Sequence, residues 1–211
     1  MSKIKGVFFD MDGVLVEAKD WHYQALNKAL SLFGYSISQD EHLRRFDGLP
    51  TKVKLQKLSL EKDLPVELHG FINEMKQQYT FNIVENLCRP RFDHEYALSK
   101  LKSEGFILAC CSNSIRASID LMMKHSHLDR YLDFVVSNQD VKRSKPDPEI
   151  YLKALEIANL DVSEVVICED NENGIKAAID AVGDNNVLII NDVSDVNYQN
   201  IRNKIHQLES M

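Results

Sequence analysis

Residues 4–16, IKGVFFDMDGVLV, decide how this chain folds. The first part of the stretch, Ile4–Asp10, is short and apolar without polar alternation, which is typical of a strand buried on both faces of a parallel sheet. Asp10 closes this strand, and Asp12 and Gly13 follow directly. Since ligands of an open parallel sheet bind beyond the carboxyl ends of its strands, we expect both aspartates at a ligand-binding edge.

Four more segments have the character of buried strands, and helical patterns lie between them. The strand candidates are Phe106–Cys111 and Val165–Cys168, with weaker ones at Phe134–Ser137 and Val187–Ile190. The helical candidates are Glu95–Glu104, Ile115–Lys124, Pro148–Asn159 and Asn173–Val182. Strands that alternate with helices imply right-handed crossovers. We therefore predict an α/β fold with a doubly wound parallel sheet.

The interval from Glu17 to about Asn86 breaks this alternation, because it contains no convincing strand. Its helical stretches are Trp21–Phe33, Gln39–Arg45, Thr51–Ser59 and Pro65–Ile83. A plain crossover needs only about a dozen residues, and this interval is far longer. We predict a core domain formed by residues 1–16 and 87–211, with a helical domain of residues 17–86 inserted after the first strand.

Composition limits the classes of partner. The chain has 211 residues and a net charge of −7, so the phosphate backbone of a nucleic acid is not an expected partner, although a local basic pocket for one small phosphate is compatible with it. The apolar runs are too short to span a bilayer, and the N-terminal residues do not resemble a secretion signal. The four cysteines form no CxxC pair, which favours core packing in a reduced cytoplasm. No obligate protein partner is evident.

Polar residues also follow the other strands. Ser112 and Asn113 follow the second strand, Lys145 lies between the third and fourth, and Glu169 and Asp170 follow the fourth. Each has a structural alternative: Ser112 as a helix cap, Lys145 as a surface charge, and the acidic pair as the complement of a helix N-terminus. Their joint occurrence at strand ends favours an active site instead.

The order of these motifs resembles the haloacid dehalogenase superfamily, in particular its phosphatase and β-phosphoglucomutase-like branch with a helical cap. The resemblance covers essentially the whole chain. It rests on four motifs: Phe9-Asp10-Met11-Asp12-Gly13-Val14-Leu15, Cys111-Ser112-Asn113-Ser114, Lys145-Pro146-Asp147-Pro148, and Glu169-Asp170 followed by Gly174-Ile175-Lys176-Ala177-Ala178.

The resemblance implies a role for each motif. Asp10 would attack phosphorus and become an aspartyl-phosphate, which divides one difficult displacement into two easier ones. Asp12 would protonate the leaving oxygen and then deprotonate the incoming water or hydroxyl. Ser112 and the amides near it, with Asn113 binding substrate, would hold phosphoryl oxygens. Lys145 would neutralise the nucleophile and the transferring group.

The carboxylates also predict a metal. The carboxylates converge on one pocket against the single Lys145; they are those of Asp10, Asp12, Glu169 and Asp170. Such crowding would leave the nucleophile protonated unless a cation were present. An all-oxygen site suits Mg²⁺ better than Zn²⁺. By resemblance, the ligands are Asp10, the backbone carbonyl of Asp12, and Asp170, with Glu169 in a supporting position or as an alternative ligand.

The helical insert corresponds to the family's cap, which would close over the site and bind the leaving group of the substrate. Candidate contacts are His22, the stretch Gly48–Lys52 with Thr51 and Lys52, and Lys76. For His22 the alternative is a residue on a helix face without a role in binding, and for the two lysines it is a solvated surface position.

The chain departs from the family pattern at several positions. It has Glu17-Ala18 where relatives carry Asp followed by a hydroxyl residue, and Thr51-Lys52 where the mutase has an arginine. Both weaken a mutase assignment. Two further departures, Arg89-Pro90-Arg91 and Asn171, have no evident meaning.

The resulting hypothesis is a Mg²⁺-dependent phosphatase for a small phosphorylated metabolite such as a sugar phosphate. A phosphomutase is the alternative enzyme, and a catalytically silent binding or regulatory protein is the alternative from another class. Dehalogenase and phosphonate hydrolase are disfavoured because, by resemblance, those relatives lack the second aspartate of the first motif.

Overall fold

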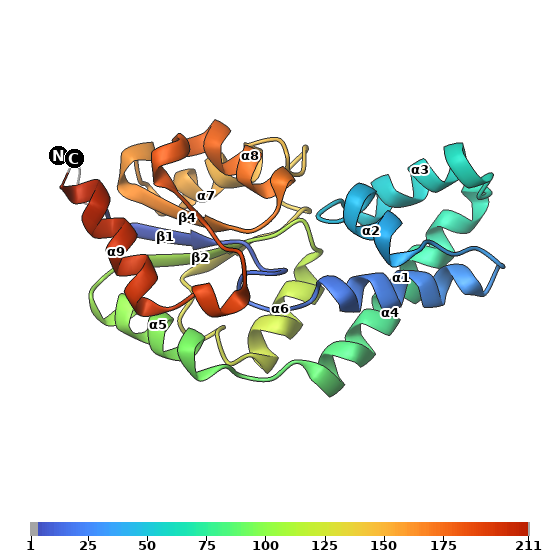
Figure 1. Cartoon of the computed structure of the whole chain (residues 1–211), viewed down its shortest axis with the longest axis horizontal. Coiled ribbons are helices and arrows are strands. Elements are labelled where there is room, and N and C mark those ends of the chain that lie inside the picture. The colour runs from blue at the N-terminus through green and yellow to red at the C-terminus, as the bar shows by residue number, and fades with distance from the viewer. Residues whose placement is uncertain (1–3, 211) are drawn as a thin grey trace.

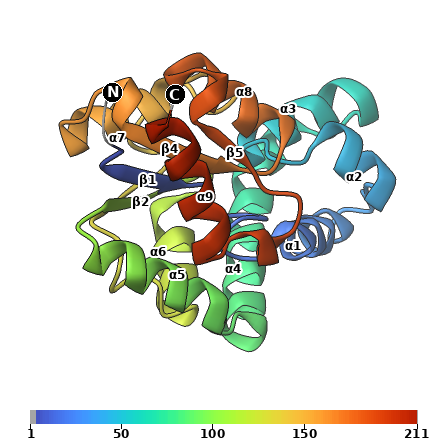
Figure 2. The ribbon, with the colours of Figure 1, turned by 60° about the vertical axis from the view of Figure 1, so that its left-hand side comes forward.

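A computed structural model describes residues 4–210 and contains one sheet of five parallel strands in the order β3-β2-β1-β4-β5 (Figure 1). The prediction of an α/β fold with a doubly wound parallel sheet is confirmed, because helices cover both faces of this sheet (Figure 2). The strands are β1 (Gly6–Phe9), β2 (Ile107–Cys111), β3 (Phe134–Val136), β4 (Val165–Glu169) and β5 (Val187–Ile189).

The central strand β1 sets the position of the first motif. Phe9 pairs with Cys110 of β2 on one side and with Cys168 of β4 on the other. The backbone N–H of Asp10 then donates to the carbonyl of Cys168 across 3.0 Å. Because all strands run in the same direction, Asp10 and Glu169 leave neighbouring strands at the same edge of the sheet.

Side chains of β1 alternate between two apolar layers. Val7 and Phe9 pack with α5 (Phe92–Ser103), α6 (Arg116–His125) and α9 (Tyr198–Glu209). Phe8 faces the opposite layer, which contains α7 (Glu149–Ala158) and α8 (Glu172–Val182). Burial on both faces explains why the strand sequence is continuously apolar.

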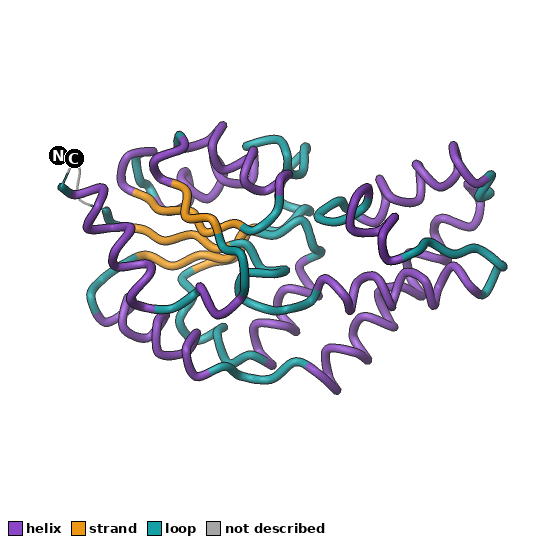
Figure 3. The backbone as a smooth tube through the Cα atoms, in the orientation of Figure 1, coloured by secondary structure: helices purple, strands orange, loops and turns teal. Residues whose placement is uncertain are grey.

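The helical insert, defined here as α1 to α4, contains helices and loops only (Figure 3). It has an apolar cluster of its own. Its helices are α1 (Lys19–Ser31), α2 (Gln39–Arg45), α3 (Thr51–Lys62) and α4 (His69–Leu87). The cluster includes Leu26, Phe46 and Leu58, all buried. This separate cluster supports our proposal that residues 17–86 form a domain distinct from the sheet domain of residues 1–16 and 87–211.

Some predicted boundaries are wrong by a few residues. Helix α3 continues to Lys62, and a short 3₁₀ turn, Val66–Leu68, separates Pro65 from the start of α4. Helix α9 lies outside the predicted elements, although Ile201 and Ile205 bury one helical face. Further 3₁₀ turns occur at Val162–Glu164, Asp184–Asn186 and Val193–Asp195.

Within residues 4–210, no helix combines the length and the apolar character that crossing a bilayer requires.

Candidate active site

Asp10 and Lys145 form a buried ion pair at the end of β1. Lys145 Nζ lies 2.6 Å from Asp10 Oδ1, 2.6 Å from Glu169 Oε1 and 2.8 Å from the carbonyl oxygen of Cys111. The Lys145 residue is 3% exposed and Asp10 is 5% exposed. The alternative of a solvated surface lysine is therefore wrong for Lys145.

The pKa values of this pair are set by burial first and by the neighbouring charges second. Burial raises the pKa of Asp10 well above its ordinary value; Lys145 opposes this, but Glu169, Asp170 and Asp12 raise it further. Burial would lower the pKa of Lys145, yet the adjacent Asp10 and Glu169 carboxylates raise it. The lysine therefore stays charged, but its one ammonium does not hold the pKa of Asp10 at the ordinary value.

Glu169 is held in place by several donors. Its Oε1 accepts hydrogen bonds from Lys145 and, at 2.5 Å, from the Tyr151 hydroxyl. A Cβ at Gly174, in the first turn of α8, would overlap the Glu169 carboxylate, so a glycine is required there. Sequence reasoning missed Tyr151; the available signal was a hydroxyl on the buried face of α7, where it needs a polar partner.

The carboxylates of Asp10, Glu169 and Asp170 form a cluster that could hold a metal ion. One oxygen from each lies within 4.8 Å of the other two. Gly13 has φ +93°, and a Cβ there would overlap the Asp170 carboxylate, so the turn after β1 needs glycine both for its backbone and for space. This all-oxygen donor set fits a hard cation such as Mg²⁺, as the sequence predicts.

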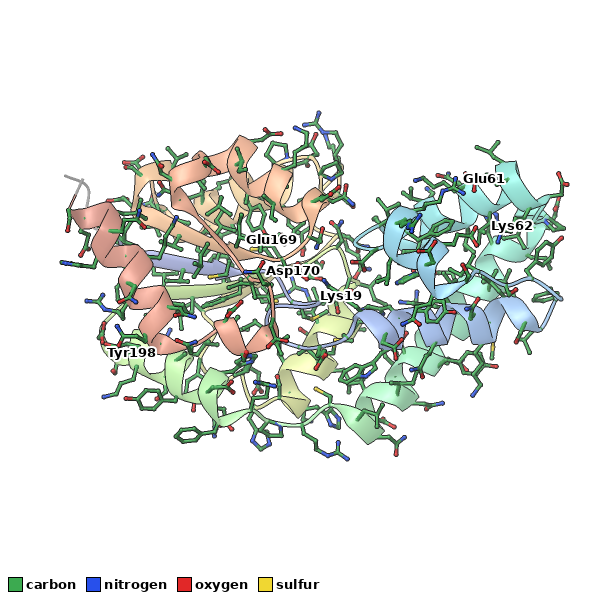
Figure 4. All side chains as sticks on the ribbon, viewed as in Figure 1. Lys19, Glu61, Lys62, Glu169, Asp170 and Tyr198 are labelled. Atoms are coloured by element: carbon green, nitrogen blue, oxygen red, sulfur yellow. The ribbon has the colours of Figure 1, made fainter. Side chains whose placement is uncertain are left out.

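Lys19 is a second cation at this cluster that sequence reasoning missed. Its Nζ lies 2.5 Å from Asp170 Oδ2 and 3.9 Å from Asp47 Oδ2. Figure 4 shows Lys19 extending from the start of α1 towards Asp170 and Glu169 at the sheet edge. Burial would lower the pKa of Lys19, but these carboxylates raise it, so its charge partly offsets that of the cluster.

The Asp12 side chain contacts both the helical insert and the loop after β2. Its Oδ1 lies 3.0 Å from His22 Nε2, and its Oδ2 accepts a hydrogen bond from the Ser114 hydroxyl at 3.2 Å. Lys76 Nζ lies 3.1 Å from His22 Nδ1. Since a lysine ammonium can only donate, Nδ1 accepts and the protonated Nε2 donates to Asp12.

The protonation states along this chain follow from its charges. Burial and the nearby Lys76 lower the pKa of His22, which favours the neutral ring. Burial would raise the pKa of Asp12, but the interactions with His22, Lys76 and Ser114 lower it. Asp12 is therefore an ionised carboxylate in this arrangement and is ready to accept a proton.

Ser112 and Asn113 lie between the sheet and the insert. Ser112 is buried and its Oγ accepts from the Ser114 N–H at 3.0 Å; helix α6 starts later, with Ile115 as its cap residue, so the helix-cap alternative is wrong. The Asn113 amide nitrogen donates to the carbonyls of Gly48 and Lys145, at 2.9 and 3.2 Å. Asn113 thus links the Gly48 loop of the insert to the Lys145 motif of the sheet domain.

The loop of residues 47–50 brings the insert against the sheet edge. Gly48 has φ +69°, and a Cβ there would come within 2.9 Å of the Asn171 side-chain oxygen. The Asn173 side chain donates to the Asp47 carbonyl at 3.4 Å. Asn171, whose departure from the family pattern had no evident meaning, therefore lies against this loop.

A pocket of about 220 Å³ lies between the sheet edge and the insert. Of the predicted substrate contacts, His22, Asn113, Thr51 and Lys52 all line it, and Lys52 is exposed. Lys76 lines it too and is bonded to His22, so its alternative as a solvated charge is wrong. Lys54, which sequence reasoning missed, is buried in the same wall.

The pocket is locally basic although the chain is acidic overall. The lysines in its lining outnumber the aspartates, so it suits an anionic ligand. The lysines are Lys19, Lys52, Lys54, Lys76 and Lys145, and the aspartates are Asp10, Asp12 and Asp47.

The chain is similar to several known proteins. The profile of the family described as haloacid dehalogenase-like hydrolase matches residues 7–184. A phosphorylated carbohydrates phosphatase from Thermotoga maritima is 29% identical over 175 residues, covering 83% of this chain and 80% of that protein. A phosphoglycolate phosphatase from Aquifex aeolicus is 26% identical over 174 residues, covering 81% and 78%.

Among solved structures, a β-phosphoglucomutase from Clostridium difficile has a TM-score of 0.82 at 20% identity, covering 99% of this chain and 100% of that one. At this identity the likeness shows a shared fold.

Proposed function

The chain belongs to the haloacid dehalogenase-like hydrolases, and from that premise we propose that it is a Mg²⁺-dependent phosphatase that acts through an aspartyl-phosphate on Asp10. Membership of this family makes the protein an enzyme of phosphoryl or related group transfer.

One observation carries the proposal. A buried Asp10 is paired with Lys145 Nζ at 2.6 Å, and Asp12, two residues on, faces the same pocket with its carboxylate held by His22 and Ser114. A nucleophilic carboxylate and a separate acid/base carboxylate are what two-step phosphoryl transfer through an enzyme-bound intermediate requires.

In the first step, a carboxylate oxygen of Asp10 attacks phosphorus and the bond between phosphorus and the ester oxygen breaks. The leaving oxygen takes a proton from Asp12 in its protonated form. Lys145 and the backbone amides after Ser112 bind the phosphoryl oxygens, where negative charge is distributed during transfer.

In the second step, water attacks phosphorus and the bond to Asp10 breaks, which releases inorganic phosphate. Asp12, now ionised, accepts the proton of that water. The hydrogen bonds from His22 and Ser114 stabilise the ionised form, so the geometry is best suited to this step.

Asp10, Asp170 and the Asp12 carbonyl would hold Mg²⁺, with Glu169 supporting them through Lys145 and Tyr151. When bound, the ion supplies positive charge that lowers the raised pKa of Asp10 and offsets the charge of the substrate phosphate. The clustered all-oxygen donors support this assignment.

We infer that the substrate is a small phosphorylated metabolite. The basic pocket of about 220 Å³ supports a compact anion, and the names of two relatives, a phosphorylated carbohydrates phosphatase and a phosphoglycolate phosphatase, point to the same class.

A phosphomutase remains the second candidate, and one observation favours it. A mutase must bind a second phosphate of its bisphosphate intermediate. The sequence offers Lys52 and Lys76 as cations of the insert, and Lys54, which sequence reasoning missed, also lines the pocket. The absence of an arginine at Thr51 and of a hydroxyl at Ala18 still favours hydrolysis.

The test is a screen of phosphorylated metabolites with Mg²⁺, reading released phosphate, with Asp10→Asn as the matched inactive control. Phosphate release by the wild type alone is the expected result. Phosphorus NMR of β-glucose 1-phosphate with a trace of glucose 1,6-bisphosphate separates the candidates. Faster accumulation of glucose 6-phosphate than of free phosphate would identify a mutase, and no turnover on any ester would indicate a silent binding protein.

A further inference from the structure

Lys54 is a buried cation that the reaction proposed above does not use. It lies in the first turns of α3 and is 7% exposed, while its neighbours Leu55 and Leu58 are almost fully buried. Among residues 4–210, no hydrogen bond or ion pair involves its ammonium; Asp47 and Asp12 attract it only at longer range. An ammonium that no carboxylate pairs, on a side chain that is largely buried, is costly; because Lys54 lines the pocket, an anion bound there could pair with it.

The surroundings of Lys54 explain where a partner could come from. Lys54 lines the pocket that also contains Asp10, and Lys76, Asn73 and Gln77 of α4 line the facing part of the insert. The charge of Lys54 is among the causes that lower the pKa of Lys76 to about 7, the first being burial. An anion between the two lysines would relieve this repulsion and keep both protonated.

The N-terminus of α3 adds donors at the same place. Its cap residue is Pro50, and no side chain caps the helix. The pocket is lined by Thr51 and Lys52, whose backbone N–H groups are the first of the helix. Free N–H groups and the helix dipole favour an anion at this position.

We propose that Lys54, together with Lys76 and the uncapped N-terminus of α3, forms a second anion site that selects phosphate esters whose leaving group carries another anionic group, either a carboxylate or a second phosphate. This deepens the proposed phosphatase function and rests on it. The first phosphate binds at Asp10 and Lys145, and the second anion binds on the insert.

Three esters with the same three-carbon chain test the proposal. They are 3-hydroxypropyl phosphate, 3-phosphonooxypropanoate and propane-1,3-diol bisphosphate, with a neutral, a carboxylate and a phosphate end. We expect kcat/KM for one or both anionic esters to exceed that of the neutral ester by roughly 30-fold or more in the wild type, because a buried charge pair is formed. The ester with the larger gain identifies the second group.

The Lys54→Met variant should reduce this preference to near one, with kcat/KM for the neutral ester changed by less than about threefold. Lys54→Arg, which keeps the charge, should retain a preference. Lys57→Met removes the same charge from the same helix outside the pocket, and should leave the preference intact. Equal losses for all three esters in Lys54→Met, or no preference in the wild type, would overturn the proposal.

A binding experiment separates this site from the phosphatase activity. Calorimetry with Mg²⁺ compares propane-1,3-bisphosphonate with propylphosphonate, neither of which can be hydrolysed at a phosphate ester. We expect Lys54→Met to weaken the binding of the bisphosphonate by roughly 30-fold or more and to leave the binding of propylphosphonate unchanged. If Lys54→Met weakens bisphosphonate binding but the wild type hydrolyses no phosphate ester, the phosphatase function is rejected and the anion site is retained. If the affinity for the bisphosphonate is the same in Lys54→Met as in the wild type, the anion site is rejected, whatever the activity.

Discussion

Lys145 Nζ lies 2.6 Å from Asp10 Oδ1 although 135 residues separate them in the chain. The same ammonium is 2.6 Å from Glu169 Oε1, so one buried cation joins three of the predicted motifs. Two carboxylates from different strands therefore depend on it for their position.

Lys145→Met should abolish turnover and also destabilise the fold. Removing the ammonium leaves Asp10 and Glu169 buried without their cation, which costs about 3–5 kcal/mol in other proteins. Thermal unfolding and phosphate release measure the two effects. Lys142→Met, an exposed lysine in the preceding loop, is the control and should change neither; a stable Lys145→Met protein would show that the pair contributes little to folding.

Asp10→Asn should remain folded and lose several orders of magnitude in kcat, because the side chain is nearly isosteric but cannot form an aspartyl-phosphate. Circular dichroism and phosphate release test both parts. Beryllium fluoride with Mg²⁺ should bind the wild type as a mimic of the phosphorylated aspartate, and should not bind the variant. Substantial activity in Asp10→Asn would place the nucleophile elsewhere.

Removal of the metal should stop the reaction, since burial and the neighbouring carboxylates raise the pKa of Asp10 and Lys145 alone does not compensate. EDTA should abolish phosphate release and added Mg²⁺ should restore it, with Ca²⁺ a poor substitute because its coordination is larger and looser. Full turnover in metal-free buffer contradicts the proposed site.

Gly13→Ala should displace Asp170 and weaken Mg²⁺ binding, because the added Cβ would overlap the Asp170 carboxylate. Gly34→Ala is a matched control: its φ is also positive, at +78°, but nothing lies within 4 Å of the added Cβ. Both variants should lose about 1 kcal/mol or more of stability from backbone strain. Only Gly13→Ala should raise the Mg²⁺ concentration needed for activity; equal effects would mean that strain alone is responsible.

Lys54 should make stability depend on pH in a defined direction. Burial lowers its pKa from 10.5 to about 8, against the attraction of Asp47 and Asp12, so the unfolded chain binds this proton more tightly than the folded one. The charge therefore destabilises the fold fully below about pH 8, and the penalty disappears as the pH rises towards 10.5.

Lys54→Met should accordingly be more stable than the wild type at pH 7, by about 3 kcal/mol on the scale of 1.36 kcal/mol per pKa unit. Denaturant unfolding at pH 7 and pH 10 measures the difference, which should shrink at the higher pH. Lys57→Met should show no such dependence. A variant less stable than the wild type at pH 7 would mean that the Lys54 charge supports folding.

The positions of the main candidate residues follow from local sequence. Asp10, Ser112 and Glu169 each come at or just after an apolar strand, and parallel strands bring such positions to one edge of the sheet whatever the rest of the chain does. The strand pattern itself is readable because β1 is buried on both faces and cannot tolerate alternation.

Only the tertiary structure decided how the insert completes the pocket. Lys54, Lys76 and Lys19 lie on helices whose local sequence is compatible with solvent, and their burial depends on which face of α3, α4 or α1 turns towards the sheet edge. Lys54 shares a helical face with Leu55 and Leu58, a weak signal that gains meaning only with a neighbour in place. The sequence therefore determined which residues meet at this edge of the sheet, because strand direction alone brings them together. Charge and burial in the pocket depend on long-range packing, which local patterns indicate only weakly.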